Sequence, residues 1–327
     1  MTKLMIYGAT GYTGRMAAER ARAAGLDFVL GGRDETRLAK LASELDAEHR
    51  TFGVGDACAI DEALSDVDVL LNCAGPFMRT AAPLMNAAIR SGTHYLDVAA
   101  ELDSYRLAEE LDGAASKADV MLLPGSGGSV AMLGSLAGHA ATRVAAPVRL
   151  RVALHVSGSM SRGSAISATE NLTSECLERV DGALAGRSPE ELRDFDFGAG
   201  PKACFPVTLP DLVTIWRATG IPNIETFVHV SGDAFPTGDV ATIPDGPTAE
   251  QREANRYQAA VEATGADGTV ARSILDTVNG YTFTPMAAVE AARRVLGGEV
   301  QPGFQTPVGL FGYGFAETIA DTHIVDV

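Results

Sequence analysis

The stretch Tyr7-Gly8-Ala9-Thr10-Gly11-Tyr12-Thr13-Gly14-Arg15 follows the apolar segment Leu4–Tyr7 and opens an amphipathic segment. Three glycines spaced in this way between a strand and a helix are typical of the turn that holds a dinucleotide. Gly8 permits a tight turn, Gly11 lets a pyrophosphate approach the backbone, and Gly14 lets the helix pack closely on the strand. The residues expected to contact this cofactor are Gly8, Thr10, Gly11, Tyr12, Thr13 and Gly14.

Short apolar runs alternate with amphipathic stretches through the first part of the chain. The predicted strands are Leu4–Tyr7, Phe28–Gly31, Thr51–Val54, Val67–Asn72, Tyr95–Val98 and Val120–Leu123. The predicted helices are Gly14–Ala24, Glu35–Leu45, Ile60–Leu64, Ala82–Ser91 and Ser104–Lys117. This alternation predicts an α/β fold with a Rossmann-type, doubly wound parallel sheet.

At 327 residues the chain exceeds one typical domain, so we expect more than one. Pro124–Gly128 interrupts the alternation, and Ala145–Pro147 has the composition of a hinge. We predict a dinucleotide-binding Rossmann domain at 1–145, a substrate and dimerisation domain at 146–302, and a C-terminal segment at 303–327 that packs back on the Rossmann domain. In the second domain, the predicted strands are Leu150–Val156 and Ile224–Val230, and the predicted helices are Ala165–Leu184, Leu212–Thr219 with Asp211 as N-cap, Ala249–Ala263 and Pro285–Leu296.

The end of the second predicted strand indicates which nicotinamide cofactor binds. NAD enzymes place Asp or Glu about 20 residues past the glycines to bind the ribose 2′-hydroxyl. This chain has Arg33 there, nineteen residues after Gly14, and a guanidinium matches a 2′-phosphate in charge and geometry. Asp34 is expected to cap the next helix, and Arg37 either assists at the phosphate or is a solvated helix residue. We therefore predict NADP(H) as the cofactor.

Two further strand ends complete the predicted cofactor site. Asp56 is placed to accept a hydrogen bond from the adenine amino group, and small residues after Asn72 allow the dinucleotide to lie against backbone. The residues predicted beside the nicotinamide ribose are Cys73, Ala74, Gly75 and Pro76, followed by Phe77 at the substrate. Cys73 is either a nucleophile or, as is more usual at an apolar strand end, a small core residue.

Together these motifs resemble the saccharopine dehydrogenase-like oxidoreductases, a broad family that also includes trans-acting enoyl reductases of lipid biosynthesis. The resemblance is carried by Gly8–Gly14, Gly32-Arg33, Asn72–Phe77, Gly92–Asp97 with Glu101, and more weakly Ser161–Ser164, Asn279–Tyr281 and Gly303–Pro307. It implies a Rossmann domain followed by a second α/β domain, which has a mixed, mainly antiparallel sheet that covers the nicotinamide end.

Candidate catalytic residues follow the fifth predicted strand, because ligands occupy the carboxyl ends of the strands in such sheets. Tyr95 is our candidate proton donor, its hydroxyl directed at the nicotinamide while Asp97 points to the opposite face. Asp97 or Glu101 would orient the donor or hold an amine, although both are also suited to start the next helix. Ser161 and Arg162 are predicted to bind an anionic substrate group, with a helix cap as the alternative.

Charge and composition indicate which partners, location and metal content to expect. The chain carries 26 basic and 42 acidic residues, a net charge of −16, which argues against a nucleic-acid partner or an anionic membrane. Leu4 begins a strand, so no signal peptide is expected, and no apolar run approaches the ~20 residues of a membrane span. Four dispersed cysteines form no metal-ligand pattern. We expect a cytoplasmic homodimer that acts on a small molecule and holds no metal.

The sequence thus predicts an NADP(H)-dependent oxidoreductase that transfers hydride to a small C=N, C=C or C=O substrate. The alternative from a different class is a non-catalytic NADP(H)-binding regulatory or assembly protein.

Overall fold

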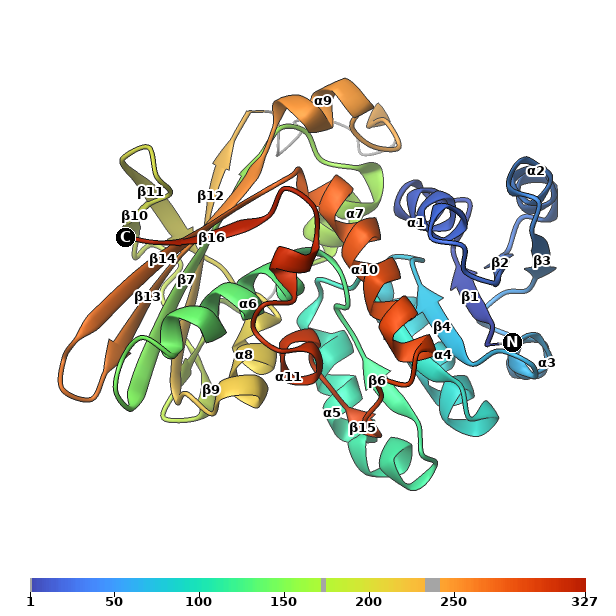
Figure 1. The fold of residues 1–327 in the computed structure, drawn as a ribbon, viewed down its shortest axis with the longest axis horizontal. Helices are drawn as coiled ribbons and strands as arrows, with labels where there is room; N and C mark the ends of the chain where they lie inside the picture. Colours follow the sequence, from blue (N-terminus) through green and yellow to red (C-terminus); the bar gives the residue numbers. More distant parts are fainter. Residues whose placement is uncertain (1, 172–174, 233–241) are drawn as a thin grey trace. The chain divides into compact units, whose positions relative to one another are not determined.

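A computed structural model describes residues 2–171, 175–232 and 242–327 of the chain. The chain divides into two compact units (Figure 1). The first unit comprises Met1–Gly128 and Thr284–Thr306, and the second comprises Ser129–Phe283 and Pro307–Val327. Each unit has its own sheet.

The sheet of the first unit is parallel throughout. Its strands are β1 (Leu4–Tyr7), β2 (Phe28–Gly32), β3 (Glu48–Thr51), β4 (Val69–Asn72), β5 (His94–Asp97), β6 (Met121–Leu123) and β15 (Gly303–Phe304). They lie in the order β15-β6-β5-β4-β1-β2-β3, which is the doubly wound order with β15 added beside β6. The predicted Rossmann-type sheet is confirmed.

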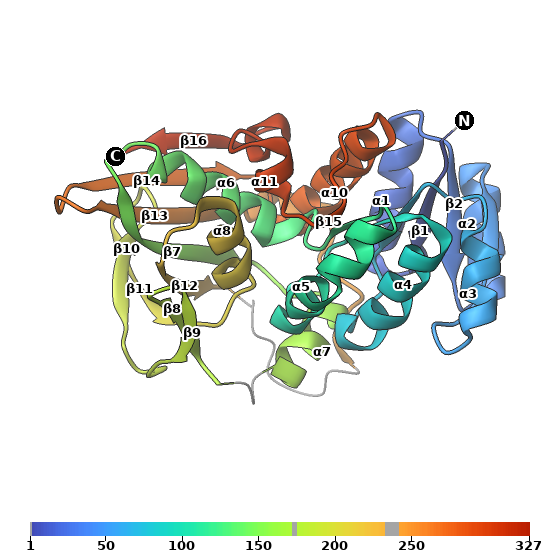
Figure 2. The same cartoon turned by 90° about the horizontal axis from the view of Figure 1, so that it is seen from below.

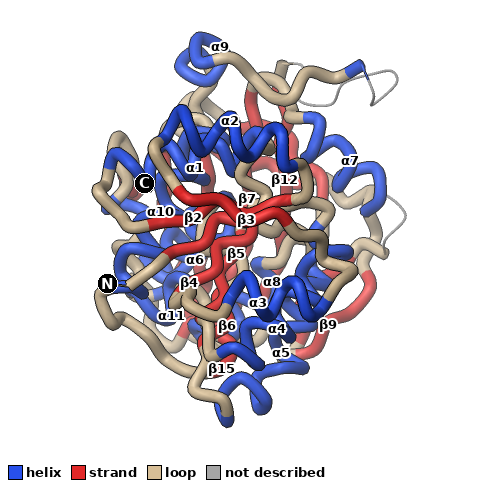
Figure 3. Tube along the Cα trace, turned by 90° about the vertical axis from the view of Figure 1, so that its right-hand side faces the viewer, coloured by secondary structure: helices blue, strands red, loops and turns tan. Residues whose placement is uncertain are grey.

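Helices cover both faces of this sheet. They are α1 (Tyr12–Ala23), α2 (Glu35–Leu45), α3 (Ala57–Leu64), α4 (Phe77–Ser91) and α5 (Leu102–Lys117). Helices α1 and α2 lie on one face, and α3, α4 and α5 lie on the other (Figure 3). Strands β1 and β4 are completely buried because helices cover them from both sides, which is why they read as unbroken apolar runs.

The second unit has a mixed sheet, as expected. Its strands are β7 (Pro147–Ser157), β8 (Leu177–Val180), β9 (Ala183–Gly186), β10 (Arg193–Asp196), β11 (Pro201–Pro206), β12 (Asn223–Ser231), β13 (Tyr257–Gly265), β14 (Val270–Thr277) and β16 (His323–Asp326). The main path is β10-β11-β12-β7-β13-β14-β16, and β7 pairs parallel with β12 but antiparallel with β13. Figure 2 shows β7, β13, β14 and β16 running alongside one another.

The remaining helices are α6 (Gly128–Ala141), α7 (Arg162–Asn171), α8 (Asp211–Thr219), α9 (Ala249–Ala254), α10 (Gly280–Leu296), α11 (Pro307–Phe311) and a 3₁₀ turn at Ala316–Thr318. Helix α8 begins at Asp211 itself, with Pro210 at the N-cap, so Asp211 is not the cap that we predicted.

The compact units differ from the expected boundaries at 145 and 302. Helix α6 belongs to the second unit because it packs against the C-terminal stretch: the Ser135 hydroxyl accepts the Ala316 amide at 3.1 Å. The segment 303–327 is divided. Its first residues form β15 beside β6, whereas β16 pairs antiparallel with β14 of the second unit, so 303–306 belong to the first unit and 307–327 to the second.

Two predicted helices of the second domain are confirmed only over their first parts and are wrong beyond them. Ala165–Leu184 contains α7 and then the hairpin β8–β9, whose turn residues Asp181 and Gly182 both have positive φ. Ala249–Ala263 contains the short helix α9 and then β13, which pairs along its length with β7 and β14. Both stretches are rich in Ala and Glu, and cross-strand pairing overrides that helix propensity.

We predict that Gly14→Ala destabilises the protein, because an added Cβ would clash with the Gly8 carbonyl. The free energy of unfolding should fall by about 1–3 kcal/mol. Gly113→Ala is the matched control, since open space surrounds this exposed position in α5, and it should stabilise by about 0.5–1 kcal/mol. Urea unfolding followed by circular dichroism measures both changes in stability. Equal changes for the two variants would contradict the close approach of Gly14 to the Gly8 carbonyl.

Candidate functional site

The phosphate loop is closely packed against the loop that follows β4. Gly8 has φ +79°, and a Cβ there would lie 2.8 Å from the Ala74 amide nitrogen. The Gly8 amide donates to the Gly31 carbonyl at 2.8 Å, and the Gly11 amide donates to the Gly8 carbonyl at 3.0 Å. The loop is therefore fixed by backbone contacts that only glycine allows at position 8.

Helix α1 begins directly after this loop, with Gly11 at its N-cap. The cap residue makes no side-chain hydrogen bond, and the first turn contains no acidic residue. The positive end of the helix dipole is therefore not neutralised by a carboxylate of its own first turn, which is the arrangement that suits a phosphate.

Arg33, directly after β2, is exposed and makes no hydrogen bond or ion pair with the described residues. Its charge opposes the rise that burial causes in the pKa of Tyr7, so it lies near the end of β1. The Arg37 guanidinium donates to the Thr10 carbonyl of the phosphate loop at 2.8 Å, and the Asp34 carboxylate caps α2 by accepting the Arg37 amide at 3.0 Å. Arg33 therefore remains available beside the loop, and the predicted Asp34 cap is confirmed.

Asp56 is the N-cap of α3, where its carboxylate accepts the Ala59 amide at 3.1 Å. The side chain lies on the surface, and the predicted contact with adenine stays a prediction.

The loop after β4 is held at both ends. The Cys73 amide donates to the Tyr7 carbonyl at 2.8 Å, and the Thr80 hydroxyl donates to the Ala74 carbonyl at 2.7 Å. The Gly75–Pro76 peptide is cis. Cys73 is half-buried, and desolvation raises the pKa of its thiol to about 12, so at neutral pH the thiol is protonated and the nucleophile interpretation is not supported.

A buried hydrogen-bond network links strands β4 and β5 to helix α4 at this edge of the sheet. The Asn72 amide group donates to the hydroxyls of Tyr95 and Thr80, each at 3.1 Å, and its oxygen accepts the Ala74 amide at 2.9 Å. The Tyr95 hydroxyl in turn donates to the Asp97 carboxylate at 2.9 Å. Sequence reasoning named Asn72 only as part of a motif and missed Thr80.

Tyr95 does not have the position that we predicted for a proton donor. Its side chain is fully buried, and its hydroxyl is committed to Asp97. Burial and the Asp97 charge raise the pKa of Tyr95 well above its usual value. The two side chains lie on the same face, not on opposite faces, because residues two apart in a strand project to the same side.

Asp97 connects β5 to the loop after β6. Its Oδ1 accepts the amides of Ala99 and Gly125 at 2.9 and 2.8 Å, and its carbonyl accepts the Ser126 amide at 2.8 Å. Burial raises the pKa of the Asp97 carboxyl to about 6, and the backbone donors and Tyr95 oppose that rise. Asp97 is thus a buried positioning group whose carboxylate accepts three hydrogen bonds, from Tyr95, Ala99 and Gly125.

Glu101 is also buried, at the N-cap of α5. Its carboxylate accepts the Phe77 amide, the first of α4, at 3.4 Å and the Ala100 amide at 3.0 Å. Phe77 itself is buried. Glu101 therefore links the starts of two neighbouring helices at the edge where the cofactor loops lie.

Ser161 and Arg162 lie at the start of α7 in the second unit. The Ser161 hydroxyl accepts the Ser164 amide at 3.2 Å, as a cap does, and the Tyr281 hydroxyl accepts the Ser161 amide at 2.8 Å. The Arg162 guanidinium donates to the Ile243 carbonyl at 2.8 Å and pairs with Asp245 at 3.1 Å. These contacts favour the helix-cap alternative over an anion site, and they join the two weaker motifs, Ser161–Ser164 and Asn279–Tyr281.

The fold and this site define a dinucleotide-binding α/β protein. Residues 4–123 match the family model of the saccharopine dehydrogenase NADP binding domain, a match that supports NADP(H) binding by this stretch. The resemblance read from the sequence is confirmed, and the family is one of oxidoreductases.

Individual relatives agree with this match. The chain is 30% identical over 132 residues to a trans-acting enoyl reductase of Mycobacterium leprae, covering 37% of this chain and 32% of that one. It is 26% identical over 117 residues to a saccharopine dehydrogenase-like oxidoreductase of Bos taurus, covering 30% and 27%. The matched stretches thus span about a third or less of these relatives.

The fold of both units is similar to a solved structure. Apo saccharopine dehydrogenase (L-Glu forming) from Saccharomyces cerevisiae matches with a TM-score of 0.66 and 14% identity over the full length of both chains. Within the part of the chain that the structure describes, no helix has the length and apolar character needed to cross a membrane.

We predict that Tyr95→Phe lowers the free energy of unfolding by about 1–3 kcal/mol, because it leaves Asp97 and Asn72 with unpaired buried polar atoms. Tyr7→Phe is the matched control. Tyr7 is an equally buried tyrosine of the same sheet, but its hydroxyl makes only a 3.4 Å contact with the Phe52 carbonyl, so the loss should be below about 1 kcal/mol. Chemical unfolding compares the two, and similar losses would show that the network adds no stability.

Proposed function

We propose that this protein is an NADP(H)-dependent oxidoreductase that transfers hydride to a small C=N, C=C or C=O substrate. The observation that carries the proposal is the unpaired Arg33 guanidinium beside a tightly turned glycine loop, within a stretch that matches an NADP binding domain. A carboxylate at the position of Arg33 would instead repel a 2′-phosphate.

The residues at the carboxyl edge of the first sheet fit NADP(H). Gly8, Thr10, Gly11, Tyr12, Thr13 and Gly14 would hold the pyrophosphate, Arg33 the 2′-phosphate, Asp56 the adenine, and Cys73, Ala74, Gly75 and Pro76 the nicotinamide ribose. When bound, the nicotinamide accepts or delivers hydride. Arg37 has a supporting role, because its bond to the Thr10 carbonyl holds the phosphate loop next to the strand that carries Arg33.

Hydride transfer to such a substrate also requires a proton donor. Tyr95 donates to Asp97, and the Cys73 thiol has its pKa raised to about 12, so neither is suited to donate a proton near neutral pH. We propose that water or a group of the second unit supplies it. Asp97 acts as a positioning residue, and Glu101 is retained as the candidate that orients the substrate, with Phe77 beside it.

The same observation supports a second candidate, a non-catalytic NADP(H)-binding regulatory or assembly protein. In that case the buried network serves only to fix the cofactor loops. We further propose a homodimer in the cytoplasm. The second sheet ends in β10 and β16, and pairing of such edges is a common route to two-fold assembly.

We predict that Arg33→Ala weakens NADPH binding by about 1.5–3 kcal/mol, roughly tenfold to a hundredfold, and leaves NADH binding nearly unchanged. Arg20→Ala, which removes an exposed arginine from the last turn of α1, is the control and should change neither affinity. Isothermal titration of both cofactors measures the effect. Equal losses for NADPH and NADH in Arg33→Ala would rule out the 2′-phosphate contact.

The reaction itself is tested by NADPH oxidation, followed by absorbance, with a panel of small imines, enones and ketones. We expect turnover with one of these classes, and retained turnover in Tyr95→Phe because its hydroxyl is not the donor. NADPH binding without turnover across the panel would favour the regulatory alternative.

A further inference from the structure

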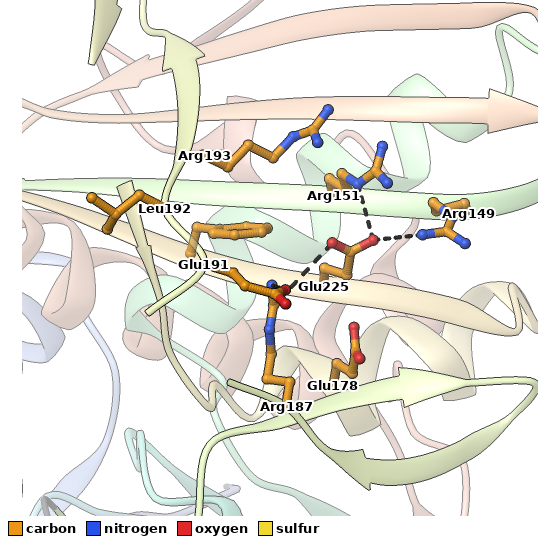
Figure 4. Close-up of a pocket in the computed structure, with 9 residues that line it drawn as sticks. Arg149, Arg151, Glu178, Arg187, Glu191, Leu192, Arg193 and Glu225 are labelled. Carbon is orange, nitrogen blue, oxygen red and sulfur yellow. Dashed lines mark hydrogen bonds and ion pairs between the residues drawn. The ribbon is translucent and has the colours of Figure 1, made fainter. Parts of the chain in front are cut away.

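The second unit contains a pocket of about 340 Å³ that is lined mainly by charged side chains (Figure 4). Its lining residues are Arg149, Arg151, Glu178, Arg187, Glu191, Leu192, Arg193, Glu225 and Phe227. Four arginines and three glutamates contribute to this lining. All these residues belong to the second unit, so the pocket is separate from the cofactor site in the first unit.

Strand alternation produces one wall of this pocket. Arg149 and Arg151 of β7 project from the same face, while Leu150 and Val152 between and beyond them are buried on the other. The parallel register sets Arg151 beside Glu225 of β12. The face of the sheet is therefore charged at this end.

The Glu225 carboxylate is already used by two of the arginines. Its Oε1 accepts from Arg149 Nη1 at 2.8 Å and from Arg151 Nε at 2.9 Å, and both side chains converge on it in Figure 4. Its Oε2 lies 4.0 Å from Arg187 Nη1, which is too long for a hydrogen bond. One buried carboxylate thus faces three guanidinium groups.

Arg187 has buried nitrogen atoms that lack hydrogen-bond acceptors among the described residues. Its side chain is only 4% exposed, yet its Nε and Nη1 make no hydrogen bond with any described residue. Its Nη2 lies 3.6 Å from the Glu191 carboxylate, itself 69% exposed, and its guanidinium stacks 4.8 Å from the Phe227 ring centre. Buried N–H groups without an acceptor are costly, so Nε and Nη1 of this arginine favour a ligand that supplies acceptor oxygens.

Arg193 adds a second donor of the same kind. Its Nη2 pairs with Glu262 at 2.7 Å, but its buried Nε has no partner among the described residues. A group with several oxygen acceptors and two negative charges would satisfy both arginines at once, because guanidinium N–H pairs match phosphate and carboxylate oxygens.

We propose that this pocket binds a compact dianionic oxyanion, supplied by a small phosphorylated or dicarboxylate metabolite. The volume suits a small molecule and exceeds that of a single phosphate group. Arg187 would contribute Nε and Nη1 and Arg193 its Nε, while Arg149 and Arg151, which share the Glu225 carboxylate, would form the pocket wall. The site does not depend on the proposed reductase function.

The test is isothermal titration of the full chain at pH 8 with inorganic phosphate and with succinate, against sodium chloride at matched ionic strength. We expect saturable binding of at least one dianion. Arg187→Gln should weaken it at least tenfold. Arg149→Gln, at a more exposed position, should also weaken it and covers the case in which Arg187→Gln does not fold.

Two controls separate this site from other cationic positions. Arg256→Gln removes an exposed, ion-paired arginine of the same unit outside the pocket and should leave binding unchanged. Arg33→Ala removes a phosphate contact of the cofactor site, and the binding that Arg187→Gln weakens should persist in it, which separates the pocket from that site. Preference for phosphate or for succinate identifies the ligand class. The proposal is overturned if neither dianion binds better than chloride. It is also overturned if Arg187→Gln and Arg149→Gln both bind the dianion as tightly as the unmodified protein.

Discussion

The carboxyl edge of the first sheet depends on one buried carboxylate. Asp97 accepts hydrogen bonds from Tyr95, Ala99 and Gly125, and so ties the end of β5 to the loop after β6. Through Tyr95 the same network reaches Asn72, which fixes the loop after β4. Because that loop lies against Gly8, the position of the phosphate turn is linked to Asp97 through packed backbone.

The polar side chains at this edge are of two kinds: those that hydrogen-bond to other residues of the protein, and those that do not. Asn72, Tyr95 and Asp97 are buried and fully engaged with one another, so their polar atoms serve structure. Arg33 is exposed and has no partner among the described residues, so its charge is available to a ligand. This difference separates positioning residues from binding residues better than closeness to a strand end, which Tyr95 and Arg33 share.

The sequence was sufficient to predict features that depend on residues close to one another in the chain. The glycine spacing and the apolar runs predicted the parallel sheet, and Asp34 was identified as a cap because helix starts favour such residues. The hairpin β8–β9 was missed although Asp181-Gly182 is a typical two-residue turn, because the flanking Ala, Leu and Glu favour a helix. Strand β13 was missed because its formation depends on β7 and β14, which lie elsewhere in the chain. The role of Tyr95 was misjudged because burial and hydrogen bonding are tertiary properties.

The arginine pocket could not be predicted from the sequence. Arg33 could be found from the sequence, since the fold gives a role to the residue that follows the second strand. Arg149, Arg187 and Glu225 have no such local motif, and they come together only because β12 pairs in parallel with β7 over nine residues and the segment after β9 passes over that face. What distinguishes Arg187 from a surface arginine is its buried, unpaired nitrogen atoms, and these exist only in the folded chain. An unsatisfied buried donor is therefore informative about binding in a way that the residue type alone is not.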